Sequence, residues 1–203
     1  MIFGPVIIRK CPECFGQIQQ YTLDSYNTFC FVPRTDGRRP IPFSDIFHIC
    51  PFCNAALFIN ELEKIGETEP EIVKETFPQS RSAKFLNMHD YLSVLEKEVF
   101  DIHKKKFLRI RAWWSGNDDR ILQHKTDQVL SEDEKDNLHK LYELLVPSDD
   151  EERMMIAEIK RELGEYDEAR QHLTDPFPQE FTRIVSTIMK LIEEADPRVA
   201  EVK

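Results

Sequence analysis

The spacing of apolar residues changes once along the chain, from the short runs typical of strands to the longer period of helices. Short β-rich runs fill the first sixty residues: PVIIRK, GQIQQYTL, NTFCFV, FHIC and ALFI. RTDGRRPIP interrupts them, and its Asp36-Gly37 pair indicates a turn. NELEKIGETEPE, residues 60–71, predicts a short helix that ends at Gly66 and is followed by an acidic connector. We therefore expect a small β-rich domain at the start of the chain.

A helical period begins near residue 88. Residues 88–114 carry apolar side chains at helical spacing, and Ser-Gly-Asn at 115–117 predicts the end of this helix. Two capping boxes, SEDE at 131–134 and SDDE at 148–151, each predict the start of a further helix. Because short turns join these helices, we expect them to pack antiparallel to their neighbours.

One helical turn has the pattern of a tetratricopeptide unit. In LGEYDEA, Gly164, Tyr166 and Ala169 match the G-x-Y-x-x-A turn between the two helices of such a unit. No second copy lies about 34 residues earlier or later, and repeat arrays need roughly three units. The pattern therefore predicts one repeat-like hairpin within a helical bundle.

The cysteines carry the clearest chemistry. There are five: Cys11, Cys14, Cys30, Cys50 and Cys53. Four of them form two CxxC pairs, CPEC and CPFC, with 35 residues between the pairs. A two-residue spacer lets both sulfurs of a pair bind one ion, and two pairs complete a tetrahedron. The usual gap between such pairs is roughly 15–20 residues, so the longer insert here must form its own hairpin or loop.

Three kinds of chemistry fit paired cysteines. A secreted disulfide framework is disfavoured by the odd cysteine count and by the absence of a signal-peptide pattern. A thioredoxin-like redox motif explains one CxxC pair and leaves the second unexplained. A metal ion explains all four cysteines, and we expect one structural Zn²⁺ per chain, although the ligands alone do not distinguish zinc from iron.

The surroundings of the pairs add detail. With four thiolates bound, zinc keeps no open position for water, so we do not expect catalysis by the metal. The turn after each pair needs a positive φ, which Asn54 tolerates and Gly16 supplies freely. His48 is expected to be structural, and Cys30 to be a small buried side chain.

These observations predict an α+β protein in which a small β-rich zinc ribbon precedes an antiparallel helical bundle with one tetratricopeptide-like hairpin. The expected organisation is a ribbon at 1–67, a connector at 68–90 and a helical domain at 91–203.

Charge is distributed unevenly. The net charge is −10 overall, with +1 on residues 1–60 and −11 on the remainder. An acidic helical part repels a phosphate backbone, but Arg34, Arg38 and Arg39 form a small basic cluster that is a candidate nucleic-acid contact. No stretch approaches the ~20 apolar residues of a membrane span, and we expect a cytoplasmic protein.

The segment RAWWSGNDDR, residues 111–120, is a candidate site. We expect Trp113 in the core and Trp114 partly exposed; Trp114, Asn117, Asp118 and Arg120 are candidate partner contacts, because Trp and Arg are favoured in binding hot spots. An alternative of low weight is an enzyme that uses Asn117, Asp118 and Asp119.

Taken together, these motifs resemble a family of uncharacterised bacterial proteins that pair an N-terminal CPxC…CPxC zinc ribbon with a tetratricopeptide-like helical C-terminus. The matching segments are the two CxxC pairs, SYNTF (25–29), TDG (35–37), INELEKIGE (59–67), RAWWSGNDDR and AEIKRELGEYDEA (157–169). Phe15 and Asn54 stand where that family usually has glycine. The resemblance implies an architecture and no reaction.

The leading functional hypothesis is a non-enzymatic zinc protein whose helical domain binds another protein. The alternative is a nucleic-acid-contacting ribbon that uses the three arginines, with the acidic helical domain recruiting a partner. The oligomeric state is left open by the sequence.

Overall fold

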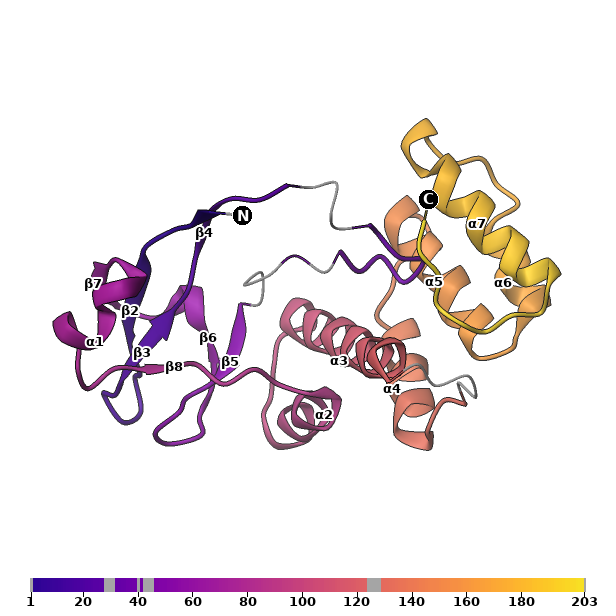
Figure 1. The fold of residues 1–203 in the computed structure, drawn as a ribbon. Helices are drawn as coiled ribbons and strands as arrows, with labels where there is room; N and C mark the ends of the chain where they lie inside the picture. The colour runs from indigo at the N-terminus through magenta and orange to yellow at the C-terminus, as the bar shows by residue number, and fades with distance from the viewer. Residues whose placement is uncertain (1, 28–31, 40, 42–45, 124–128, 203) are drawn as a thin grey trace. The chain divides into compact units, whose positions relative to one another are not determined.

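The computed structural model describes most of the 203 residues. The described ranges are 2–27, 32–39, 41, 46–123 and 129–202 (Figure 1). The protein is mixed α+β, with about 47% helix and 16% strand.

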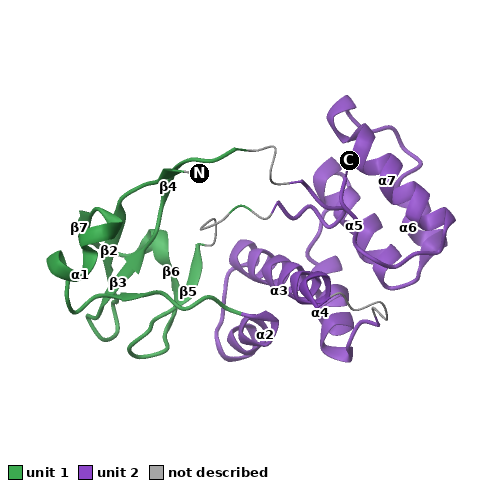
Figure 2. Cartoon of the chain, in the orientation of Figure 1, with its two compact units in different colours: residues 1–31, 41–86 green, residues 32–40, 87–203 purple. Residues whose placement is uncertain are grey.

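The chain forms two compact units (Figure 2). Unit 1 consists of residues 1–31 and 41–86, and unit 2 of residues 32–40 and 87–203. This division differs from the expected one in two places: loop 32–40 belongs to the helical unit, and the expected connector belongs to unit 1 as far as residue 86.

Unit 1 is built from short strands. Its elements are β1 (Ile2–Phe3), β2 (Val6–Lys10), β3 (Gln17–Gln20), β4 (Leu23–Ser25), β5 (Phe47–Ile49), β6 (Ala56–Phe58), η2 (Ile59–Glu61), β7 (Lys64–Thr68), η3 (Pro70–Ile72), α1 (Val73–Thr76) and β8 (Arg81–Ser82). A four-stranded sheet has the order β7-β2-β3-β8, in which only the β3–β8 pair is parallel. Two two-stranded sheets, β1-β4 and β5-β6, complete the unit.

The segment after residue 67 belongs to unit 1 because its apolar side chains cover the sheet. Val6 and Ile8 alternate along β2, so both side chains point to one face, where Val73 of α1 packs on them. The predicted helix near Gly66 is wrong, since this glycine lies in β7. A Cβ at Gly66 would lie 2.5 Å from Cζ of Phe77, so only glycine allows this ring to approach the strand.

Unit 2 is helical. Its elements are α2 (Met88–Lys97), α3 (Ile102–Leu122), α4 (Glu132–Tyr142), α5 (Asp150–Glu162), α6 (Tyr166–His172), η4 (Gln179–Phe181) and α7 (Thr182–Glu193). Within the described ranges, none of the helices combines the length and the apolar content that a membrane crossing requires.

Two boundaries of the long predicted helix are wrong. The helical run breaks between α2 and α3, where the side chain of Asp101 caps α3 by accepting a hydrogen bond from the N–H of Lys104. At its other end α3 continues through Gly116 as far as Leu122. A Cβ at residue 116 would lie 2.7 Å from Oε1 of Glu134 on α4. Here glycine permits a close helix contact and does not end the helix.

Capping side chains determine where helices α4 and α5 begin. Ser131 and Glu134 form the predicted capping box of α4. The predicted box at Ser148 is wrong by one residue, since Asp149 caps α5 through the N–H of Glu152.

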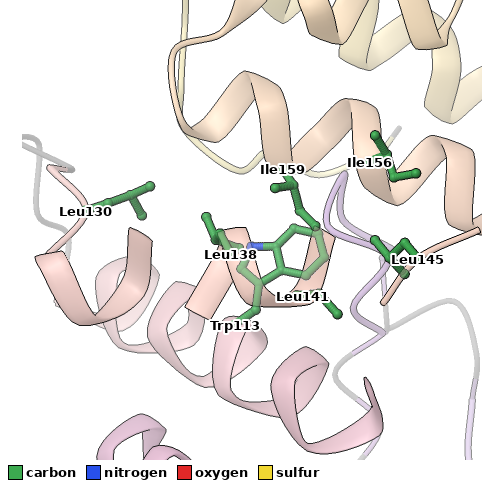
Figure 3. Close-up of a cluster of buried hydrophobic side chains, with 7 residues drawn as sticks. All are labelled: Trp113, Leu130, Leu138, Leu141, Leu145, Ile156 and Ile159. Atoms are coloured by element: carbon green, nitrogen blue, oxygen red, sulfur yellow. The ribbon is translucent and has the colours of Figure 1, made fainter. Parts of the chain in front are cut away.

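Unit 2 has two apolar clusters. In the first, Trp113 of α3 lies among side chains of α4, α5 and their flanking turns (Figure 3): Leu130, Leu138, Leu141, Leu145, Ile156 and Ile159. The second joins α5, α6 and α7 through Met154, Ala157, Ala169, Leu173, Ile188 and Ile192. Adjacent faces of α5 therefore serve both clusters, which makes this helix the centre of the unit.

We expect Leu141→Ala to lower the free energy of unfolding of unit 2 by about 2–5 kcal/mol, because Leu141 is fully buried and its truncation leaves a cavity. Both tryptophans lie in α3, so urea unfolding followed by tryptophan fluorescence reports on this unit. Val146→Ala, at a residue that is 50% exposed, should cost under about 0.5 kcal/mol. Equal losses for the two variants would contradict the assigned core.

Candidate metal centre and a buried carboxylate network

Unit 1 gathers four cysteine sulfurs at one point. The Sγ atoms of Cys11, Cys14, Cys50 and Cys53 all lie within 4.8 Å of one another. Two cross-pair distances, Cys11–Cys53 and Cys14–Cys50, are both 3.7 Å. This is far longer than the ~2.05 Å of a disulfide, and the four thiols are free. Metal–sulfur bonds of ~2.3 Å in a tetrahedron place the sulfurs about 3.8 Å apart. The cluster is therefore compatible with one metal ion.

The two turns that present the sulfurs have the same backbone pattern. Each begins at the end of a strand, β2 for the first and β5 for the second. In the first turn, the N–H of Cys11 donates to the carbonyl of Gly16, and the N–H of Phe15 donates to the carbonyl of Cys11. Cys50 makes the equivalent pair of bonds with Ala55 and Asn54. A repeated turn of this kind aims both sulfurs of each pair at a common point.

A positive φ ends each turn. Asn54 has a φ of 62°, as predicted, whereas in the first turn the left-handed residue is Phe15, with a φ of 61°. The prediction that Gly16 supplies the positive φ is therefore wrong. Gly16 allows a different contact: a Cβ there would lie 2.5 Å from Cδ2 of the Phe52 ring.

The ionisation of the thiols favours a cation. A hydrogen bond from the backbone N–H of Gly16 lowers the pKa of Cys14. The pKa of Cys53 rises to about 12: the N–H of Ala55 favours its thiolate, but burial and the hydrogen bonds with the neighbouring thiols prevail. Burial raises the pKa of Cys11. A cation bound by the sulfurs would favour their thiolate forms.

The residues present fit a soft divalent ion, since thiolates are ligands of zinc and of iron. His48 does not join the four sulfurs; its imidazole is buried and stacks edge-on against Phe85. Cys30 lies outside the described residues. The metal-ligand set predicted from the sequence is the set that the structure brings together.

A second polar site lies inside unit 2, where three distant segments meet. They are loop 32–40, α3 and α5; the loop also pairs with the C-terminal residues through Arg34 and Glu201. We call the buried polar group that joins them the Asp36 network. It consists of Arg34, Asp36, Trp113, Trp114, Asn117, Asp118 and Glu162.

Asp36 is fully buried at its centre. Its carboxylate accepts from Nη2 of Arg34 at 2.9 Å, from Nδ2 of Asn117 at 2.9 Å and from the N–H of Arg38 at 3.0 Å. Its backbone carbonyl accepts from Nε1 of Trp114 at 2.8 Å. A buried carboxylate is tolerated when it is paired and fully hydrogen-bonded, as it is here.

The candidate nucleic-acid arginines are mostly engaged in this network. The side chain of Arg34 is 8% exposed and donates to Asp118 at 2.6 Å as well as to Asp36. Arg38 lies 3.6 Å from the same Asp118 carboxylate and over the ring of Trp114. Only Arg39 is exposed. The expected three-arginine surface is therefore corrected: Arg34 faces the interior because it neutralises buried carboxylates.

The candidate partner contacts are likewise internal. Asn117 is 1% exposed, and Asp118 holds the loop arginines. Arg120 donates to Glu134 and to Oδ1 of Asn117, which links α3 to the cap of α4. Trp114 is half-buried. The polar groups of Asn117, Asp118 and Arg120 thus make contacts within the unit, while Trp114 and Asp118 remain partly exposed.

The three residues of the enzyme alternative do not converge. Asn117, Asp118 and Asp119 are consecutive in α3, and neighbours along a helix point in different directions. Asn117 is buried, Asp118 is in ion pairs and Asp119 is exposed.

The sequence analysis missed Asp36 and Glu162 as site residues. The signal was present for Glu162, because it shares the buried face of α5 with Glu158 and Arg161, where a helix usually carries apolar residues. For Asp36 the only signal was the turn, since its partners Trp114 and Asn117 come from the distant α3.

Replacing Cys50 by serine should remove the ion. We expect one divalent ion per chain in the purified wild-type protein and less than about 0.1 per chain in Cys50→Ser, because three thiolates and a hydroxyl bind soft metals poorly. Native mass spectrometry measures this ratio. Cys30→Ser is the matched control and should keep its metal; loss of metal from both variants would contradict the four-cysteine assignment.

The Asp36 network should make stability depend on pH. Burial and the nearby charge of Glu158 raise the pKa of Glu162 to about 8, from 4.5 in an open chain. Between these values the folded state binds the extra proton, so the free energy of unfolding should fall as pH rises, by up to about 1.4 kcal/mol per pH unit, and level off above pH 8.

Glu162→Gln keeps an oxygen that can accept the 3.0 Å hydrogen bond from Nε1 of Trp113 but does not titrate. We expect this variant to reduce the decline between pH 5 and 8 in urea unfolding followed by tryptophan fluorescence, while Asp36, whose pKa burial also raises, keeps its own contribution. Glu165→Gln, at the partly exposed partner of Lys160, should retain it. An unchanged slope in Glu162→Gln would show that another group titrates.

Comparison of the chain with protein-family models, with curated proteins and with solved structures gave no match in any of the three. The family resemblance of the sequence motifs therefore stays a prediction.

Proposed function

We propose that the protein is a non-enzymatic zinc protein that binds another protein through its helical unit. The observation that carries this proposal is the set of four thiol sulfurs within 4.8 Å of one another. Four thiolates fill a tetrahedral coordination sphere, so the ion has no position left for a substrate or an activated water.

In this proposal zinc stabilises a ribbon. The β2–β3 and β5–β6 hairpins each carry one CxxC turn, and the ion joins the hairpins. The apolar cluster beneath the sulfurs is small, with Ile18, Leu57 and Ile59 as its non-cysteine buried members. Zinc binding to small domains contributes on the order of 10–16 kcal/mol, so the ion would supply much of the folding free energy of unit 1.

The α5–α6 hairpin supports a tetratricopeptide-like helical module. Gly164 has a φ of +82° after α5, and the N–H of Glu165 donates to the carbonyl of Lys160, which closes the helix end. Ala169 is fully buried between α5 and α7, and the hydroxyl of Tyr166 donates to the carbonyl of Ala195. The helix end at Gly164 and the burial of Ala169 support a tetratricopeptide-like hairpin.

A groove in unit 2 is the proposed partner site. It has a volume of about 980 Å³ and lies between loop 32–40, α5 and the start of α7. Its apolar lining includes Met154, Met155, Phe181 and Ile184. Methionine adapts its shape to different ligands, and the volume suits a short peptide segment with apolar anchors.

Charges of both signs surround this apolar lining. Arg39 and Arg183 contribute cations, and Glu151 and Glu180 contribute carboxylates. All four side chains are exposed. This arrangement favours a peptide of mixed charge and would set its orientation in the groove.

Native mass spectrometry of the protein purified gently from its own source tests both the proposed zinc ion and the proposed protein partner. We expect one zinc ion per chain and a co-purifying protein. Reversing both rim cations, with Arg39→Glu and Arg183→Glu, should reduce the co-purifying protein at least tenfold and leave the zinc in place, because both side chains are exposed. Lys190→Glu, an exposed reversal on the same helix α7 outside the groove lining, is the matched control.

Iron in place of zinc would contradict the proposed metal. A partner that is retained equally by the rim variant and by the control would contradict the groove.

A further inference from the structure

Unit 1 carries two exposed phenyl rings beside its cysteine turns. They belong to Phe15 and Phe52. Lys10 and Arg81 lie close to these rings, and Lys84 donates to Asn54 in the second turn. We call this group of five residues the knuckle face: Lys10, Phe15, Phe52, Arg81 and Lys84.

Both the backbone conformation and the exposure of Phe15 are unfavourable for this residue type. Its φ of 61° lies in the left-handed region, which is unfavourable for a bulky side chain, and the residue is 68% exposed. Asn54, the matching residue of the second turn, has nearly the same φ and tolerates it well. Neither backbone conformation nor burial favours phenylalanine at residue 15, and strained residues of this kind cluster at functional sites.

Phe52 is fixed in place. Its ring lies against Gly16, where a Cβ would approach Cδ2 to 2.5 Å, and the guanidinium of Arg81 lies 4.8 Å from the ring centroid. Phe52 remains 38% exposed, and Lys10 lies 5.3 Å from the ring of Phe15. The knuckle face therefore presents preorganised aromatic surface with a cation at each ring.

The charge of unit 1 is segregated. The segments 10–16, 50–54 and 81–84 carry three cations and one carboxylate, whereas residues 61–75 carry six carboxylates and two lysines. Lys10 lies 3.6 Å from Glu63, and Lys84 donates to the Asn54 amide. Within the described part of the chain, neither Arg81 nor Lys84 forms an ion pair.

Rings flanked by cations fit one class of ligand best. We propose that the knuckle face binds single-stranded nucleic acid, with a base stacking on Phe15 and phosphates meeting Arg81 and Lys84. Stacking on a projecting ring needs only a few residues, whereas a stable protein interface buries about 800 Å² on each partner. This site is separate from the three arginines of the sequence hypothesis and does not depend on the groove of unit 2.

The electrostatic contribution should be modest. A closed four-thiolate site with a divalent ion carries two negative charges, which the three cations offset. The face can make at most three phosphate contacts. A plot of log K for binding against log salt concentration should therefore have a slope no steeper than about −2.

The test uses the metal-loaded full chain and a fluorescein-labelled 12-nucleotide oligothymidylate, with anisotropy measured at ~50 mM salt. We expect Phe15→Asn to weaken binding about 5- to 150-fold, the range for loss of one stacking aromatic. The same substitution should raise the unfolding temperature of unit 1 by a few degrees and leave the metal content unchanged, because asparagine tolerates the positive φ.

A second experiment compares how two substitutions change the salt dependence of oligonucleotide binding. Arg81→Gln should flatten the salt dependence by about 0.7 in slope. Lys64→Gln, at a lysine that pairs with Glu67 on β7, should leave it unchanged.

Three results would overturn the proposal: no binding at ~50 mM salt, unchanged affinity in Phe15→Asn, or a duplex of the same length binding at least as tightly as the single strand. The first would leave a protein partner as the explanation of the exposed rings, and the last would show that contacts are made to phosphates alone.

Discussion

The buried carboxylate of Asp36 holds the helical unit together. It receives hydrogen bonds from its own loop and from α3, while Asn117 of α3 also reaches Glu162 of α5. Removing one partner of such a buried pair typically costs 3–5 kcal/mol, because the remaining charge is left without compensation. The contact between the short loop and the two helices therefore depends on each member of the network being present.

Unit 1 depends on a different constraint. Its strands are two to five residues long, and its buried clusters contain few side chains. Elements of this size do not bury enough apolar surface to specify one arrangement by packing alone. The convergence of four sulfurs offers such a restraint, since an ion bound by both turns would fix the two hairpins against each other.

The sequence predicted the local features that depend on neighbouring residues. The spacing of Cys11, Cys14, Cys50 and Cys53 identified the ligand set, and the Ser131 capping box located the start of α4. Predictions failed where a distant contact decided the outcome. Gly116 and Gly66 were interpreted as helix ends, yet each lies within an element, where the missing Cβ leaves room for a side chain from elsewhere in the unit.

The same limit applies to the arginines and to RAWWSGNDDR. Their composition is typical of binding surfaces, and only the fold shows that Arg34, Asp118 and Asn117 bind one another. Burial of charge cannot be inferred from a linear pattern, because it depends on which segments meet.

The path of the chain between the units has a thermodynamic consequence. Loop 32–40 belongs to unit 2, but it lies inside the 35-residue insert that separates the two CxxC pairs of unit 1. The Asp36 network fixes part of this insert within unit 2, so the segment that joins the two CxxC pairs must also satisfy the folding of the helices. Folding of the helical unit and closure of the four-cysteine cluster thus share a single stretch of backbone.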